Sequence, residues 1–267
     1  MVVFPNAKIN IGLHVTEKRS DGYHNLETIF FPIPLQDILE LEKNNLNETR
    51  FTCSGIEIPN DGKDNLVVRT FKKIQDKFDL PHVDIHLHKN IPTGAGLGGG
   101  SADAAFMIKL CEQYFELNYT NNYAFDLAKS IGADCPFFLH NQACFAQGIG
   151  DEISPIVLNL KDYFLVLVYP DIHVSTALAY QGVVPQKKDI ALPLEIAKDI
   201  KQWKNVVVND FEKSVFNQFP AIAEVKQKLY DQGAIYASMS GSGAAVFGIF
   251  EKEPVIDTNH QNWIFKL

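Results

Sequence analysis

The sequence contains a glycine-rich run at residues 92–103, Pro-Thr-Gly-Ala-Gly-Leu-Gly-Gly-Gly-Ser-Ala-Asp, whose residue types and spacing suit phosphate binding. Glycine can adopt positive φ angles, and it has no side chain that would keep a ligand away from the backbone. The residues after the run favour a helix, and the first-turn N–H groups of a helix attract anions. Ser101 adds a hydroxyl group that can contact a phosphate or a bound Mg²⁺. This run, called the glycine loop below, is therefore predicted to bind phosphate.

The glycine loop differs from the two commonest nucleotide-binding loops. A Walker A loop ends in Gly-Lys-Ser/Thr, whereas here the glycines are followed by Ser101 and Ala102. A Rossmann loop is followed about 20 residues later by an acid after a second strand, and here Glu116 and Asp126 lie in or beside helix-like sequence. A flexible linker is the alternative interpretation, but a linker needs neither the strand-like residues before the loop nor the helix former after it. By itself the loop indicates phosphate binding and does not define the reaction.

Two charged residues outside the loop could supply the other groups that phosphoryl transfer needs. Asp134 lies among apolar residues just before Pro136, and Lys8 lies on the polar side of an N-terminal strand. Each also has a plainer explanation, because such an aspartate often caps a helix and such a lysine is often solvated. Phosphoryl transfer requires a cradle for the donor, a group that orients or deprotonates the attacking hydroxyl, and a cation near the developing charge. The glycine loop, Asp134 and Lys8 would supply these three.

The hydrophobic pattern predicts the elements that carry these residues. Alternating or continuous apolar runs predict strands at 4–15, 26–32, 37–41, 49–58, 83–88, 143–150 and 163–169, and a small-residue loop from 238 that feeds a strand ending at 250. Helical spacing predicts helices at 65–78, 102–114, 123–131, 175–180, 192–203, 211–216 and 220–232. This order of elements indicates an α+β fold rather than a regular βαβ alternation. A composition shift at 154–162 predicts two domains, residues 1–153 and 154–267.

Composition limits the classes of protein to consider. The chain has 267 residues, of which 46% are hydrophobic and 21% are charged, as in ordinary globular proteins. A net charge of −8 disfavours a nucleic-acid-binding surface. The four cysteines lack CxxC or metal-ligand spacing, and we expect His82, His86 and His88 to share a solvated strand face. With no recognisable signal peptide or membrane-spanning run, we expect a cytoplasmic protein without nucleic-acid or membrane partners.

The glycine loop, read as Pro-x-Gly-x-Gly-Leu-Gly-Gly-Gly-Ser, resembles the ATP loop of the GHMP small-molecule kinases. Segments 7–13, 132–137 and 239–244 resemble the first, the catalytic-aspartate and the third motifs of that family, so the resemblance covers nearly the whole chain. It implies an α+β, two-domain GHMP kinase fold with the active site in the cleft between the domains, and it implies ATP and Mg²⁺ as cofactors. The positions that match ATP-binding residues are Asn65, Pro92, Gly94, Ala95, Gly96, Leu97, Gly98, Gly99, Gly100 and Ser101, of which Ser101 also matches a position near Mg²⁺.

The same resemblance implies roles for the charged and aromatic residues. Asp134 matches the base that takes the proton from an acceptor hydroxyl, and Lys8 matches the residue paired with it. Segment 19–26 resembles the signature of members that phosphorylate the 2-hydroxyl of a cytidine-diphosphate-linked substrate in non-mevalonate isoprenoid synthesis. The implied small-molecule partner therefore carries a cytidine diphosphate group, and the implied assembly is a monomer or a weak homodimer. The positions that match substrate-binding residues are Asn10, Tyr23, His24, Thr176 and Tyr180.

The chain departs from the family pattern at two loop positions. Many members have two serines after the glycines, whereas here Ala102 follows Ser101, and Ala95 replaces a glycine found in some members. We expect Ala95 to be tolerated if its φ angle is negative. Two alternatives remain: a GHMP kinase for mevalonate, homoserine or a sugar, and a catalytically silent nucleotide-binding protein. Segment 19–24 argues against the first, and the retention of both Lys8 and Asp134 argues against the second.

Overall fold

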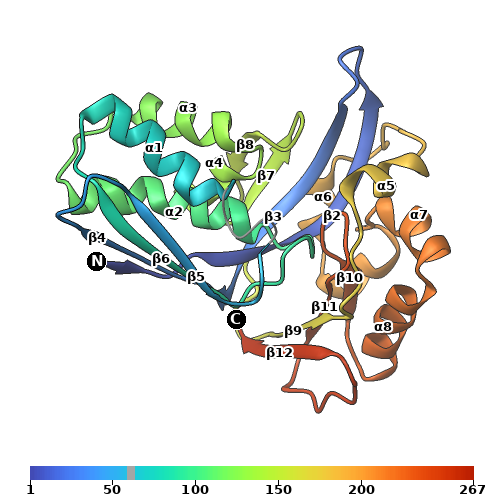
Figure 1. Ribbon diagram of the computed structural model, residues 1–267. Helices are drawn as coiled ribbons and strands as arrows, with labels where there is room; N and C mark the ends of the chain where they lie inside the picture. Colours follow the sequence, from blue (N-terminus) through green and yellow to red (C-terminus); the bar gives the residue numbers. More distant parts are fainter. Residues whose placement is uncertain (59–63) are drawn as a thin grey trace. The chain divides into compact units, whose positions relative to one another are not determined.

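The computed structural model describes residues 1–58 and 64–267, and the chain divides into two compact units. The first unit comprises Met1–Ala7, Ile33–Thr93 and Gly98–Asn141, and the second comprises Lys8–Pro32, Gly94–Leu97 and Gln142–Leu267. The glycine loop therefore contributes residues to both units. Each unit combines helices with sheets, so the α+β class is confirmed (Figure 1).

The first unit is a four-stranded sheet covered by helices (Figure 1). Its strand order is β1-β4-β6-β5, with β5 parallel to β6 and the other neighbours antiparallel. In β6 the residues alternate between buried and more exposed positions, so Ile85 and Leu87 pack with Phe71 and Ile108 of the helices. The strands are β1 (Val2–Val3), β4 (Ile38–Lys43), β5 (Arg50–Gly55) and β6 (Val83–Lys89), and the helices are α1 (Leu66–Phe78), α2 (Gly99–Tyr114), α3 (Asn121–Ile131) and α4 (Cys135–His140).

The second unit contains a sheet of strand order β10-β11-β9-β12, and β9 lies inside it. The four consecutive central residues of β9, 165–168, are all buried, so both faces of this strand are covered, as its continuous apolar run predicts. Val166 and Val168 of β9 pack in one core with Ile222 and Val225 of α8. The elements are β9 (Phe164–Tyr169), α5 (Thr176–Gln181), α6 (Leu192–Ile196), the 3₁₀ helix η2 (Ile200–Asn205), α7 (Phe211–Gln218), α8 (Pro220–Asp231), β10 (Tyr236–Met239), β11 (Val246–Phe250) and β12 (Gln261–Lys266).

A third sheet has the strand order β2-β3-β7-β8. Its strands are β2 (Asn6–Lys18), β3 (His24–Gln36), β7 (Cys144–Gln147) and β8 (Glu152–Pro155). Both β2 and β3 are 13 residues long, and β2 is buried along its first ten residues. These long strands carry Lys8, Asn10 and His24, three of the residues predicted for the site.

The structure differs from the predicted elements in a few places. The helix predicted at 192–203 is divided into α6 and η2, because the chain leaves helical geometry between Ala197 and Asp199. Helix α4 was not predicted because Pro136 lies within it, and a proline interrupts a helical pattern. Strands β8 and β12 were also missed, since both are short and mostly exposed edge strands. Among the described residues, no helix combines the length and apolar character that a membrane span requires.

Candidate active site

Lys8 and Asn10 lie two residues apart on β2, so the two-residue period of a strand points both side chains to one face. Nζ of Lys8 donates to Oδ1 of Asn10 at 2.6 Å and to the carbonyl of Gly96 at 3.1 Å. The ammonium group also lies 4.9 Å from the ring centre of Phe30. Lys8 is only 3% exposed, so the plainer prediction of a solvated lysine is wrong. Burial in this hydrogen-bond network fixes the position of the Lys8 ammonium group.

Ser240 joins the glycine loop to β2 within the second unit. Its hydroxyl donates to the carbonyl of Gly96 at 2.8 Å and accepts from the backbone N–H of Asn10 at 3.2 Å. The approach is so close that a Cβ atom on Gly96, whose φ angle is +77°, would lie 2.0 Å from the carbonyl oxygen of Ser240. Only glycine fits at this position. Three motifs that are far apart in the sequence therefore meet at Gly96, Asn10 and Ser240.

The glycine loop has the backbone geometry of an anion-binding loop. Gly94, Gly96 and Gly98 all have positive φ angles, whereas Ala95 does not, as its replacement of a glycine requires. Gly98 is the N-cap of α2, and it has no side chain that could cap the helix. The first intrahelical bond runs from the N–H of Ala102 to the carbonyl of Gly98 at 2.9 Å. The N–H groups of the preceding residues, 99–101, can therefore serve a ligand.

Ser101 and the Asp134 segment lie together in the first unit. The side chains of Ser101 and of Cys135, the residue after Asp134, both lie beside Gly132, because a Cβ atom there would be 3.8 Å from the Ser101 hydroxyl and 3.4 Å from the Cys135 sulfur. Burial raises the pKa of the Cys135 thiol to about 12, so it stays protonated near neutral pH. Asp134 occupies the N-cap position of α4 but its carboxylate forms no capping hydrogen bond. The predicted phosphate-loop hydroxyl and the predicted catalytic carboxylate are thus carried by adjoining segments.

A hydrogen bond also connects the later part of α4 to α2. Nζ of Lys109 on α2 donates to the carbonyl of Phe138 at 2.8 Å. Burial lowers the pKa of Lys109. With Ser101 beside its start and Lys109 bonded to its later part, α2 holds the short helix that begins after Asp134.

A buried ion cluster lies at the end of β6, where the chain enters the glycine loop. Lys89 pairs with Asp37 and with Asp103, the latter at 2.8 Å. Oδ1 of Asp37 accepts from the N–H groups of Asn90 and Ile91 at 2.6 and 2.9 Å. Burial by itself lowers the pKa of Lys89, but the carboxylates of Asp37 and Asp103 have the larger effect and raise this pKa overall. Burial raises the pKa of Asp103 to about 7. The cluster holds the strand that precedes the loop to the helix that follows it.

Asn65 lies at the N-terminus of α1, and its Oδ1 accepts from the N–H of Val67 at 2.8 Å. This is the bond of an N-cap side chain. The next residue, Leu66, has its Cδ1 atom 3.7 Å from the place where a Cβ atom of Gly100 would lie. Asn65, predicted to line an adenine pocket, is therefore beside the start of α2.

Three of the predicted substrate residues lie in or beside α5 in the second unit, namely His24, Thr176 and Tyr180. The rings of His24 and Tyr180 are stacked, with centres 4.7 Å apart and an angle of 21°. Tyr180 also meets the ring of Phe211 edge to face at 4.7 Å. Thr176 lies one helical turn before Tyr180, and its hydroxyl is 3.3 Å from that of Ser242. Tyr23, at the tip of the β2–β3 connection, is 62% exposed, so it is His24 and not Tyr23 that pairs with Tyr180 here.

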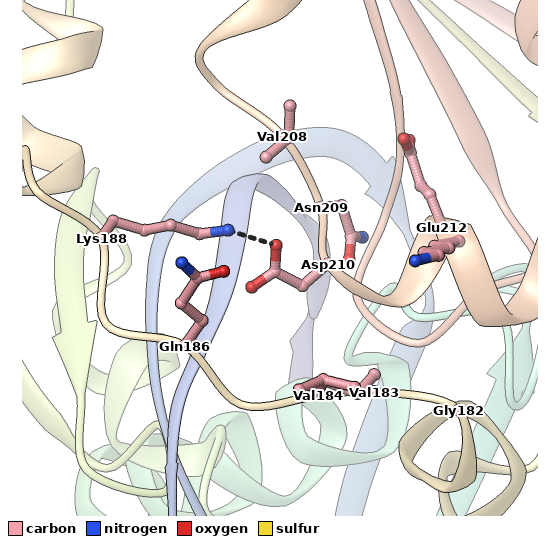
Figure 2. Close-up of a pocket in the computed structure, with 10 residues that line it drawn as sticks. Gly182, Val183, Val184, Gln186, Lys188, Val208, Asn209, Asp210 and Glu212 are labelled. Atoms are coloured by element: carbon pink, nitrogen blue, oxygen red, sulfur yellow. Dashed lines mark hydrogen bonds and ion pairs between the residues drawn. The ribbon is translucent and has the colours of Figure 1, made fainter.

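A pocket of about 380 Å³ lies in the second unit beside α7, between segments 182–188 and 208–213 (Figure 2). Figure 2 shows the carboxylate of Asp210 facing the ammonium group of Lys188, at a distance of 2.9 Å. None of the residues predicted for ATP or substrate lines this pocket. It does contain Asn209, which sequence reasoning missed because a single polar residue between helices gives no periodic signal. Ser240 was missed as a site residue too, although the small-residue run around it marked a loop.

Comparison with known proteins identifies the class to which this geometry belongs. A family model for the GHMP kinase N terminal domain matches residues 65–142, and one for the GHMP kinase C terminal region matches residues 191–258. The first match includes the glycine loop and Asp134. The fold and the motifs therefore define a GHMP kinase, and the predicted two-domain fold of that class is confirmed.

Relatives of higher sequence identity show which family of GHMP kinases the chain belongs to. A 4-diphosphocytidyl-2-C-methyl-D-erythritol kinase from Bacteroides fragilis is 52% identical over 258 residues, covering 96% of this chain and 94% of the relative. The enzyme of the same name from Cytophaga hutchinsonii is 47% identical, covering 98% of this chain and 96% of the relative. A crystal structure of 4-(cytidine 5'-diphospho)-2C-methyl-D-erythritol kinase matches with a TM-score of 0.80 and 32% identity, covering 93% of this chain and 90% of that chain. The chain belongs to the family of 4-diphosphocytidyl-2-C-methyl-D-erythritol kinases.

More distant structures share the fold alone. A homoserine kinase from Cytophaga hutchinsonii matches with a TM-score of 0.61 and 15% identity, covering 97% of this chain and 93% of that chain. A mevalonate kinase from Methanococcus jannaschii matches with a TM-score of 0.69 and 14% identity, covering 94% of this chain and 90% of that chain. These identities are far below those of the relatives above, so they do not support the alternative acceptors.

Proposed function

We propose that this protein transfers the γ-phosphate of ATP to the 2-hydroxyl of 4-diphosphocytidyl-2-C-methyl-D-erythritol, a step of the non-mevalonate route to isoprenoid precursors. The observation that carries the proposal is the junction of three motifs at Gly96, Asn10 and Ser240, which holds the buried Lys8 beside the glycine loop. The identity of 52% to a kinase named for this substrate supports the choice of acceptor.

In the proposed reaction the acceptor oxygen attacks the γ-phosphorus while the bond to the bridging oxygen of ADP breaks. The proton of the hydroxyl passes to the carboxylate of Asp134, and the ammonium group of Lys8 stabilises the charge on the transferred phosphoryl group. A positioned base of this kind contributes about 10²–10⁴-fold to the rate.

The ATP phosphates would bind to the glycine loop. N–H groups at 99–101 precede the first intrahelical bond of α2, and the positive end of the helix dipole favours the anion. Asn65, beside the start of α2, would line the adenine pocket. The residues proposed to hold ATP are Asn65, Pro92, Gly94, Ala95, Gly96, Leu97, Gly98, Gly99, Gly100 and Ser101.

The donor set near Ser101 suits Mg²⁺ as a companion of ATP. Mg²⁺ prefers oxygen ligands and keeps several waters, so it needs only one or two protein groups in addition to phosphate oxygens. The hydroxyl of Ser101 is one such group, on the first turn of α2. No cluster of three or more His, Cys, Asp or Glu side chains occurs in the part of the chain that the structure describes. When bound, Mg²⁺ would neutralise charge on the phosphates.

The cytosine of the acceptor would bind to the aromatic residues near α5. Stacking on an aromatic ring supplies affinity, and a hydrogen bond to the base supplies selectivity. We assign stacking to Tyr23 and Tyr180, hydrogen bonding to His24, and contacts to the rest of the acceptor to Asn10 and Thr176. The 4.7 Å stack of His24 on Tyr180 supports placing these two residues in one pocket.

The proposal also includes a domain boundary, a cellular location and a small-molecule partner. We propose a domain boundary at residue 154, and the two family models fall on either side of it. We propose a cytoplasmic location, supported by Cys53, Cys111 and Cys135, which form no disulfide in the structure. A small molecule with a cytidine diphosphate group is the proposed partner.

The test is ADP release from ATP and Mg²⁺ with the cytidyl acceptor, beside mevalonate, homoserine and galactose. We expect turnover with the cytidyl acceptor alone. Turnover with another acceptor would keep the phosphate loop and discard the cytosine pocket. Binding of ATP without turnover of any acceptor would favour a silent nucleotide-binding protein.

A further inference from the structure

One side chain outside the proposed site holds the backbone on both sides of Ser240. Nδ2 of Asn209 donates to the carbonyl of Met239 and to the carbonyl of Gly241, each at 2.8 Å. The hydroxyl of the residue between them, Ser240, joins Gly96 to Asn10. A single amide group therefore fixes the segment from which that hydroxyl projects.

Asn209 is itself held rigidly. It is 3% exposed, and its Oδ1 accepts from the N–H of Phe211 at 3.0 Å. The segment around it pairs with β2, because Leu13 donates to Val208 at 2.9 Å and Asp210 donates to Leu13 at 2.8 Å. Asn209 is thus attached to the same strand that carries Lys8 and Asn10.

A second bond strengthens this attachment. Oδ2 of Asp210 accepts from the N–H of Val15 at 2.9 Å, and Oδ1 accepts from Lys188 at the same distance. Figure 2 shows Asn209 between Val208 and Asp210 along this segment. The segment therefore forms a fixed base for the amide of Asn209.

The bonding pattern is specific to asparagine. Both amide hydrogens and the amide oxygen are used, and an asparagine side chain offers two donors and a carbonyl acceptor. Aspartate would place a carboxylate oxygen, without a donor, against two carbonyl oxygens. Serine offers one donor on a shorter side chain. A substitution therefore leaves at least one buried carbonyl unpaired, which is costly in a protein interior.

We propose that Asn209 is a positioning residue for phosphoryl transfer. By holding the carbonyls on both sides of Ser240, it keeps the Ser240 hydroxyl on Gly96 and Asn10, and so keeps Lys8 in place. The inference rests on the proposed function, since it takes Lys8 as the catalytic cation. Asn209 acts through Ser240 and not on the substrate.

The experiment is a double-mutant cycle of Asn209→Ser and Ser240→Ala in the full chain. We would measure kcat and the KM for the cytidyl acceptor, well below the melting temperature and per mole of folded enzyme. Each single variant should lower kcat about tenfold or more and leave the acceptor KM within about twofold. The double variant should have nearly the kcat of Ser240→Ala alone, because both changes break one linkage.

The matched control is Tyr236→Phe, which removes a buried hydrogen bond from the same unit. The Tyr236 hydroxyl donates to the carbonyl of Val207 at 2.9 Å and not to the Met239–Gly241 segment. This variant should lower the melting temperature and leave kcat unchanged. A purely structural role of Asn209 would give the same result for Asn209→Ser and would overturn the proposal.

Other outcomes also decide the question. Independent losses that multiply in the double variant would overturn the linkage through Ser240. If Asn209→Ser does not fold, Ser240→Ala alone decides, because an unchanged kcat there removes the link on which the proposal depends. Lys8→Met separates the two claims: an unchanged kcat in that variant refutes the catalytic role of Lys8. A lost kcat there, with normal kcat in Asn209→Ser and Ser240→Ala, refutes only the positioning role.

Discussion

Replacement of Gly96 by alanine is the sharpest perturbation of the glycine loop. The backbone at Gly96 has a φ angle of +77°, a region that costs a residue with a side chain roughly 1–2 kcal/mol. The new Cβ atom would also lie 2.0 Å from the carbonyl oxygen of Ser240, and real Cβ atoms essentially never come within 3.0 Å of another heavy atom. One of the two segments must therefore retreat by about 1 Å.

The retreat would act on catalysis, because the Gly96 carbonyl accepts from both Lys8 and Ser240. A misplacement of about 1 Å in a catalytic constellation can lower the rate about 10²-fold, which corresponds to about 2.7 kcal/mol of transition-state stabilisation. We therefore expect the kcat of Gly96→Ala to be about 100-fold below that of the wild type. The assay is ADP release at saturating ATP and cytidyl acceptor, with a melting curve of each protein.

The matched control is Gly233→Ala, which separates backbone strain from the steric clash. Gly233 has a φ angle of +98°, and a Cβ atom there would meet nothing within 4 Å. This variant should lose roughly 1–2 kcal/mol of stability, or about 2–8 °C in melting temperature, with an unchanged kcat. A kcat in Gly96→Ala within about threefold of the wild type would refute the claim that this close approach positions Lys8.

Three further predictions concern the acceptor, the adenine pocket and the metal. His24→Ala should raise the KM for the cytidyl acceptor about tenfold or more and leave kcat unchanged, because a base contact contributes about 1–3 kcal/mol; a fall in kcat alone would contradict the assignment to cytosine. Asn65→Ala should cost about 1 kcal/mol of stability, through loss of the cap on Val67, and should also raise the KM for ATP. Stability loss with an unchanged KM for ATP would limit Asn65 to capping. Chelation with EDTA should abolish turnover, and added Mg²⁺ should restore it; full activity in metal-free enzyme would exclude the proposed role of Ser101 toward Mg²⁺.

The sequence predicted much of the fold because the pattern of apolar residues is strong. The alternation at 83–88 and the helical spacing at 65–78 correspond to β6 and α1, and Asn65 lies where the helix needs a cap. The continuous apolar run at 163–169 predicted a strand covered on both faces, and the four consecutive residues 165–168 of β9 are buried. Helix α4 was missed, since Pro136 interrupts the helical pattern of its short segment.

The sequence predicted residue types for the site better than it predicted their contacts. Glycines with positive φ and a helix start were expected from the loop composition, and Gly94, Gly96 and Gly98 have that geometry. The contacts of Asn209 and Ser240 depend on pairing between segments far apart in the chain. Neither periodicity nor local composition carries that information, so these two residues became visible only in the structure.

The most direct test of the central claim, that Asp134 assists proton removal during phosphoryl transfer, is the kcat of Asp134→Asn with the cytidyl acceptor, measured beside the Kd for ATP. We expect kcat to fall about 10²–10⁴-fold while the Kd for ATP stays within about twofold of the wild type. A kcat near that of the wild type would contradict the account.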